Sequence, residues 1–280
     1  MNYRINDIQH LREKSGFGIM DCKKALNEAN GNVEDAFSAL EAKGLQIQDK
    51  KTERKSEEGL VYADVHNSIG VILEVSAETD FVARSPEFQQ NVIEISKLIT
   101  EGKPTEELIR SMVMKFRENI QLKRFDLIEN GFPYAYNHGN GKYAVVFTLE
   151  ANHVIEEVKR DLAMQIIAMK PKYISTKKIP EDTLESMKNE ILKSIQYDRR
   201  LVNKPQNVLD KILVGRMEKL IKDLCLIDQP FIKDESISVG EMLTGKSDSL
   251  INPIRIEKFY RYEKADSINK CACATNMFIG

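Results

Sequence analysis

Short apolar stripes at helical spacing mark the first forty residues of the chain. One stripe consists of Ile5, Ile8 and Leu11. A second consists of Ile19, Cys22, Ala25, Leu26 and Ala29. Asn32, with Asp35 three residues later, predicts the start of a third helix, and Gly44 predicts its end. The pattern therefore predicts three short helices within residues 1–44.

These helices, with the sequence Gly-Asn-Val-Glu at 31–34 opening the last one, are similar to ubiquitin-associated domains. That similarity alone implies a small protein-binding module. Residues 46–58 are almost wholly polar, which predicts a solvated linker or a frayed helix after the module.

A strand–turn–strand–helix pattern then occurs twice. Its members are residues 60–65, 67–70, 71–75 and 86–99 in the first copy, and 134–137, 138–141, 143–149 and 155–169 in the second. The first copy has an insert at 76–85, between its second strand and its helix. This insert contains Thr79, Asp80, Phe81 and Val82. Ser85 as N-cap, with Pro86 at the first helical position, marks where the following helix begins.

Two further apolar stripes lie on either side of a break at 203–205 and predict an antiparallel helical hairpin. Such a hairpin packs on its own core or pairs with a second copy. The predicted fold class is α+β, with a three-helix module, two related core subdomains with small antiparallel sheets, and a coiled-coil-like hairpin. The expected domains are 1–44 (module), 45–58 (charged linker), 59–133 (first core subdomain), 134–180 with 228–263 (second), 181–227 (hairpin) and 264–280 (tail).

Composition narrows the function classes. The chain has 280 residues, with 41 basic and 43 acidic side chains and a net charge of −2. Because proteins that neutralise phosphates carry a basic excess, direct nucleic-acid binding is disfavoured. The N-terminus has no signal-peptide pattern, and no apolar stretch is long enough to span a bilayer. We therefore expect a cytoplasmic protein with no membrane association.

Residues capable of chemistry are sparse. Cys271 and Cys273 resemble half of a metal site, but the histidines are scattered, so we expect no metal and reduced thiols. No Ser/His/Asp set, carboxylate pair or glycine-rich dinucleotide turn has supporting spacing. These absences predict a protein that is not an enzyme and carries no cofactor.

One nucleotide-binding motif remains an alternative. Residues 240–247 match the phosphate-loop pattern G-x-x-x-x-G-K-[ST]. The preceding segment is poor in strand-forming residues, and Pro253 interrupts the segment after the motif. Ser238 with Glu241 instead predicts a capping box that starts a short helix. A phosphate-loop NTPase is therefore the first alternative function, and a ubiquitin-like adaptor built on residues 1–44 is the second.

Seven separate motifs resemble elongation factor Ts, a bacterial protein family. They are LREKSG at 11–16, MDCKKAL at 20–26, ETDFVA at 78–83, ENI at 118–120, NHG at 137–139, GRM at 215–217 and QPFIKD at 229–234. They fall in the family's order and cover the chain from about residue 3 to 263. The tail after residue 263 departs from the family pattern.

The resemblance implies a guanine-nucleotide exchange factor for elongation factor Tu, which binds that GTPase with GDP or without nucleotide. It implies that Asp80 and Phe81, flanked by Thr79 and Val82, press into the partner near its magnesium ion. Without the resemblance, residue type alone favours a helix cap or a solvated charge for Asp80 and a core position for Phe81. Further contacts implied less firmly are Arg12, Ile19, Met20, Lys23 and His138. A homodimer or 2:2 complex through the hairpin or the core is left open.

Overall fold

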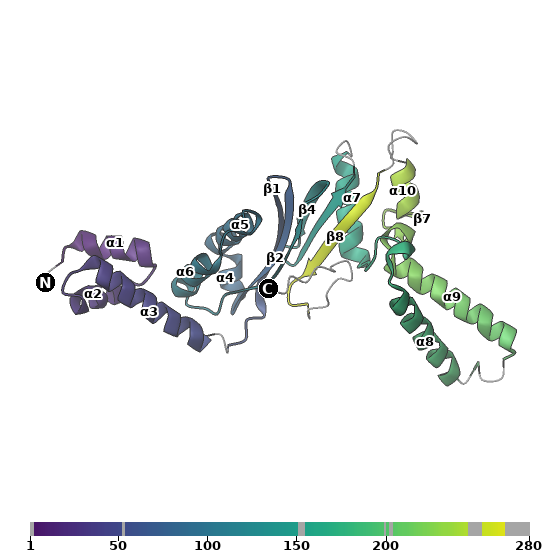
Figure 1. Ribbon diagram of the computed structural model, residues 1–280, viewed down its shortest axis with the longest axis horizontal. Helices are drawn as coiled ribbons and strands as arrows, with labels where there is room; N and C mark the ends of the chain where they lie inside the picture. Colours follow the sequence, from purple (N-terminus) through teal and green to yellow (C-terminus); the bar gives the residue numbers. More distant parts are fainter. Residues whose placement is uncertain are drawn as a thin grey trace. The chain divides into compact units, whose positions relative to one another are not determined.

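The computed structural model describes residues 3–51, 54–150, 155–198, 200–201, 204–245 and 254–266. Helices and small sheets occur together, which confirms the α+β prediction (Figure 1). Two compact units divide the chain. Among the described residues, the first contains 3–127, 137–144 and 262–266, and the second contains 128–136 and 145–261. No helix in these described ranges is long and apolar enough to cross a membrane.

Three helices form at the N-terminus, as the apolar stripes predict: α1 (Ile5–Ser15), α2 (Ile19–Glu28) and α3 (Val33–Lys51). Their shared core contains Leu11, Phe17, Cys22, Ala25, Leu26, Ala36 and Leu40. Ile5, in the first apolar stripe, is 77% exposed. The prediction that Gly44 ends the third helix was wrong. Helix α3 continues through Gly44, because one glycine costs only about 1 kcal/mol in a helix whose neighbouring residues are good helix formers.

The first sheet begins with a hairpin of β1 (Glu58–His66) and β2 (Ile69–Ala77), which pair antiparallel with Leu60 opposite Val75. Asn67 and Ser68 form the two-residue turn with φ of 51° and 65°. Positive φ at both positions is the type I′ geometry that matches the twist of a hairpin. A third strand, β3 (Gln121–Ile128), lies next to β2 and was not predicted.

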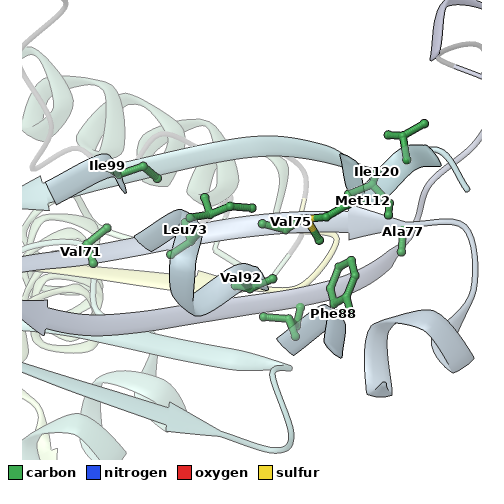
Figure 2. Packing of buried hydrophobic residues seen from close by; sticks show 12 residues of the cluster. Val71, Leu73, Val75, Ala77, Phe88, Val92, Ile99, Met112 and Ile120 are labelled. Carbon is green, nitrogen blue, oxygen red and sulfur yellow. The ribbon is translucent and has the colours of Figure 1, made fainter. Parts of the chain in front are cut away.

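Three helices come after this hairpin: α4 (Asp80–Arg84), α5 (Pro86–Thr100) and α6 (Glu106–Phe116). Only α5 was predicted. The residues that α5 contributes to the core are spaced three or four apart, and those that β2 contributes are spaced two apart, so each set lies on one face of its element (Figure 2). Strand β2 is also buried on its other face, where Ile72 is fully buried. The resulting core contains Val71, Leu73, Val75, Ala77, Phe88, Val92, Ile95, Ile99, Met112 and Ile120.

The second sheet has the order β4-β5-β8, formed by β4 (Phe132–His138), β5 (Tyr143–Leu149) and β8 (Ile256–Glu263). Helix α7 (Glu156–Met169) buries Leu162 and Ile166. This sheet repeats the plan of the first, with a hairpin, a helix and a third strand next to the hairpin's second strand. The repeat seen in the sequence is therefore a repeat of structure, although β8 itself was not predicted.

Helices α8 (Glu181–Tyr197) and α9 (Gln206–Leu224) form the predicted hairpin (Figure 1). Arg216 donates to Ser194 Oγ at 2.9 Å, and Leu184 packs in the same cluster as Ile221, so the helices run antiparallel. The short helices η1 (Thr176–Lys178) and η2 (Leu226–Asp228) flank the hairpin. The strands β6 (Pro230–Phe231) and β7 (Asp234–Ser238) then lead into α10 (Val239–Gly245).

Candidate partner-binding surface

Helix α4 is a single turn held between two caps. Thr79 is extended (φ −126°, ψ 151°), and its hydroxyl accepts the N–H of Val82 at 3.4 Å. Ser85 caps the next helix by accepting the N–H of Phe88 at 3.2 Å, with Pro86 at the first helical position as predicted. Both caps follow the preference of hydroxyl side chains for helix N-termini. The predicted insert is therefore an ordered helical turn.

The two faces of α4 have opposite environments. Ala83 is buried and Val82 packs against the core of the first sheet. Phe81 points the other way and is 84% exposed, so it is not the core residue that its type alone suggests. A ring with almost no packing of its own is positioned by the backbone that carries it, and it is available to a partner.

Asp80 is the first residue of α4 and is held only by a surface ion pair. Its carboxylate lies 3.3 Å from the Arg84 guanidinium, one helical turn away, and the two side chains are 44% and 79% exposed. Exposed pairs of this kind contribute about 0–1 kcal/mol. The Asp80 carboxylate can therefore exchange this contact for one with a partner at little cost.

A pair of glutamates joins the start of α4 to the segment after α6. The Glu118 carboxylate accepts the N–H groups of Glu78 (2.9 Å) and Thr79 (3.0 Å) and the Thr79 hydroxyl (2.5 Å). In return, the Glu78 carboxylate accepts the N–H of Asn119 at 2.7 Å and lies 3.5 Å from the Arg54 guanidinium. We call this arrangement the Glu78–Glu118 clamp. In the sequence, Glu118 stands out only as part of the ENI motif. Nothing local distinguishes an isolated glutamate from a solvated surface charge.

A cleft of about 380 Å³ separates α4 from the turn after β4. Asp80 and Arg84 line one side, and residues 139–142 line the other. Gly141 has φ 81°, and a Cβ there would lie 2.6 Å from the Leu60 side chain, so the turn needs glycine to sit this close to β1. His138 precedes the turn, half-buried, with its ring 6.3 Å from that of Tyr143. The structure thus brings the His138 turn beside Asp80.

Four predicted contact residues lie on the N-terminal helices. Ile19 and Met20 open α2 and are 53% and 76% exposed. Arg12 is exposed and Lys23 is half-buried. Asp21, next to Met20, forms ion pairs with Lys43 at 2.8 Å and Arg117 at 3.4 Å. The hydrogen bond from Lys43 is the main reason that the pKa of Asp21 is lowered. Exposed Ile5, from the first apolar stripe, is a further apolar candidate.

The described residues hold no group of three or more histidine, cysteine or acidic side chains that could bind a metal ion. Ser96, His66 and Asp64 are neighbours, but His66 Nε2 faces both Ser96 Oγ (2.9 Å) and Asp64 (3.5 Å). A catalytic triad needs the carboxylate on the other ring nitrogen, and Ser96 is fully buried. This cluster is therefore structural. Cys271, Cys273 and His153 lie outside the described residues.

The phosphate-loop motif is helical wherever it is described. Residues 240–245 belong to α10, and the predicted capping box is present: Ser238 N–H donates to Glu241 at 2.6 Å, and Glu241 N–H donates to Ser238 Oγ at 3.1 Å. A strand, β7, does lead into α10, although the segment is poor in strand-forming residues. That strand is short and largely exposed, in a two-stranded sheet, unlike the buried strand that feeds a phosphate loop. Lys246 and Ser247 lie outside the described part of the chain.

Known proteins resemble the chain over almost its whole length. The family model described as "Elongation factor TS" matches residues 78–265, which include α4, β3 and the whole second sheet but not β1 or β2. The chain belongs to the elongation factor Ts family. Elongation factor Ts of Clostridium perfringens (strain SM101 / Type A) is 35% identical over 286 residues, which covers 94% of this chain and 93% of that protein. The Clostridium kluyveri protein is 34% identical over 288 residues (94% and 93%), and the Halothermothrix orenii protein 34% over 295 residues (96% and 95%).

Membership in the elongation factor Ts family gives the chain a role in translation elongation. The candidate surface itself consists of exposed side chains on ordered helices and turns. Phe81 and Asp80 project from α4, Ile19 and Met20 from α2, and the His138 turn lines the cleft beside α4. Such an arrangement suits contact with a protein surface through shape and charge.

Proposed function

We propose that this chain binds elongation factor Tu in its GDP-bound and nucleotide-free states and promotes the release of GDP, so that GTP can replace it. The observation that carries the proposal is Phe81, a phenyl ring 84% exposed on a helical turn whose other face is anchored in the core. Aromatic side chains are over-represented among the residues that dominate binding energy at interfaces.

The mechanism uses the position of two side chains and no covalent step. Phe81 enters an apolar slot of the partner, which brings the neighbouring Asp80 carboxylate toward the groups that hold Mg²⁺. The ion is one of the largest local charges in a phosphate site, so disturbing its ligands removes attraction for the diphosphate. By linkage, the factor weakens GDP binding by the same ratio by which GDP weakens binding of the factor.

Other residues enlarge the interface in this proposal. Arg12, Ile19, Met20 and Lys23 contact the partner from the N-terminal helices, and Thr79 and Val82 flank the wedge. His138 contacts it from beside the cleft. The chain acts in the cytoplasm without a cofactor, and it is not an enzyme, because its effect is to shift binding equilibria and the rates at which they are reached.

Stopped-flow release of fluorescent GDP from the cognate elongation factor Tu tests the proposal. The wild-type chain is expected to accelerate release. Phe81→Ala is expected to lower the maximal rate by about tenfold or more, and Asp80→Asn to lower it less. Phe125→Ala, which removes a ring that is 48% exposed on β3, is the matched control and keeps the wild-type rate. Equal rates for wild type and Phe81→Ala would remove the wedge from the mechanism.

Self-association through the hairpin is a second part of the proposal. Helix α9 has no buried residue, and Val214 in its middle is 55% exposed, so its apolar side is incompletely covered by α8. Two copies packing these helices together would give a homodimer or a 2:2 complex with the partner. Light scattering should give twice the mass of one copy for the chain alone, and twice the mass of a 1:1 complex for the chain with elongation factor Tu. A Val214→Lys variant should then show the mass of a single copy in the same measurement.

A further inference from the structure

The sequence after α6 contacts both of the surfaces proposed to bind the partner. Arg117, at the end of α6, lies 3.4 Å from Asp21, the neighbour of Met20. The next residue, Glu118, accepts three hydrogen bonds from Glu78 and Thr79, the two residues that precede Asp80. Helix α6 supports this segment from two cores, since Met112 and Val113 belong to the core of the first sheet and Met114 to that of the N-terminal helices.

The Glu78–Glu118 clamp fixes the position of α4, the helix that carries Phe81. Helix α4 has five residues, too few to be stable without external support. Its inner face is held by Val82 and Ala83, and its C-terminal end by the hydrogen bond from the Ser85 hydroxyl to the Val82 carbonyl at 2.8 Å. At its N-terminal end, the Glu118 carboxylate takes up both backbone N–H groups before the helix and the hydroxyl that caps it. The N-terminal end of α4 therefore takes its position from Glu118.

The second half of the clamp is formed by the Glu78 carboxylate and Asn119. Glu78 accepts the Asn119 N–H, and the Asn119 side chain donates to the Arg54 carbonyl at 2.7 Å. Asn119 is 3% exposed, so its position does not depend on solvent contacts. The carboxylate of Glu118 thus accepts backbone N–H groups from the segment at 78–79, and the carboxylate of Glu78 accepts one from the segment at 118–119. Hydrogen bonds to charged acceptors of this kind are stronger than neutral ones.

We propose that Glu118 is a positioning residue for nucleotide exchange, which holds the start of α4 so that Phe81 and Asp80 meet the partner in the productive geometry. This inference rests on the proposed function. It assigns Glu118 no contact with the partner. Glu118 acts through Thr79 and the helical turn after it.

Glu118→Gln tests the inference with minimal change in shape. A carboxamide has one accepting oxygen, and its other terminal group only donates, so it cannot take up donors on both sides. We expect the maximal rate of GDP release to fall about tenfold, while the concentration of factor giving half the maximal effect stays within about twofold. Amide hydrogen exchange at Glu78 and Thr79 should be faster in the variant. Glu107→Gln, a change of the same type at an exposed site in the first turn of α6, should match wild type.

The double variant Phe81→Ala/Glu118→Gln separates positioning from general stability. If Glu118 acts through α4, adding Glu118→Gln to Phe81→Ala lowers the maximal rate by less than about twofold further. Additive losses, or a wild-type maximal rate in folded Glu118→Gln, would overturn the inference and leave the proposed function intact. Failure of the wild-type chain to accelerate GDP release would instead overturn the proposed function. Should Glu118→Gln fail to fold by circular dichroism, Glu78→Gln opens the clamp from the opposite side and is read in the same way.

Discussion

A buried ion pair in the first sheet gives a sharp prediction about stability. Arg124 on β3 lies 2.7 Å from the Glu74 carboxylate on β2, and the two side chains are only 15% and 9% exposed. The guanidinium also donates to the Glu263 carbonyl at 3.1 Å and stacks 4.1 Å from the centre of the Tyr262 ring. The other Glu74 oxygen accepts the Ala265 N–H at 2.9 Å. The pair therefore fastens the end of β8 to the first sheet.

Removing one partner of this pair leaves a charge with little water around it. Arg124→Met is expected to destabilise the protein by about 3–5 kcal/mol, since Glu74 keeps only its bond from Ala265. Adding Glu74→Leu removes the stranded charge, so the double variant should be more stable than Arg124→Met alone. Lys97→Ala is the control, because it breaks an exposed pair, 44% and 49% accessible, whose contribution is about 0–1 kcal/mol.

Urea unfolding followed by circular dichroism measures these differences, since the chain contains no tryptophan to report on unfolding by fluorescence. Arg124→Met should lower the unfolding midpoint far more than Lys97→Ala. Hydrogen exchange at Ala265 should become faster in Arg124→Met and stay unchanged in Lys97→Ala. Similar midpoints for the two single variants would refute the reasoning, because they would mean that Arg124 and Glu74 are solvated well enough to stand alone.

Three further variants probe other parts of the fold. Phe88→Ala should cost about 3–5 kcal/mol in urea unfolding, because the ring is fully buried and its loss leaves a cavity in the core of Figure 2. Asp21→Asn should destabilise at neutral pH. The Lys43 hydrogen bond lowers the folded pKa below the usual 3.8, so this stability is present above 3.8 and is lost as the pH falls through the folded pKa. The difference in stability between Asp21→Asn and wild type should therefore shrink as the pH falls below 3.8 and vanish once Asp21 is protonated in the folded state. A difference that stays constant across this range would contradict the assignment. Ser238→Ala removes one half of the capping box and should cost about 1 kcal/mol, seen as faster hydrogen exchange in α10.

Elements with a strong local signal were the ones that the sequence predicted. The stripes of α5 and α7 and the turn at 67–68 depend on residues close together in the chain. Strand β3 was missed because Lys123 and Phe125 are exposed on it, so its alternation between buried and exposed positions is weak. Helix α6 could have been found, since it carries Leu108, Ile109, Met112, Val113 and Phe116 at helical spacing.

The site was predictable only in part, for a physical reason. Asp80 and Phe81 came from the family resemblance, and neither their exposure nor their helical turn was evident in the sequence. The clamp is a contact between glutamates 40 residues apart, which no local pattern encodes. Glu118 is identified by what it accepts, and its three donors converge only after β2 and the end of α6 are in place. Such contacts depend on tertiary structure and are invisible to periodicity and capping rules.

Order in α4 before binding has an energetic consequence for the proposed exchange reaction. Fixing the backbone of one residue costs about 1–2 kcal/mol, so ordering the five residues of α4 at the moment of binding would cost about 5–10 kcal/mol. That is comparable with the whole binding free energy of a micromolar complex, about 8 kcal/mol. The caps and the Glu78–Glu118 clamp meet this cost during folding. The contacts of Phe81 and Asp80 can then act against nucleotide binding in the partner without first having to organise the helical turn that carries them.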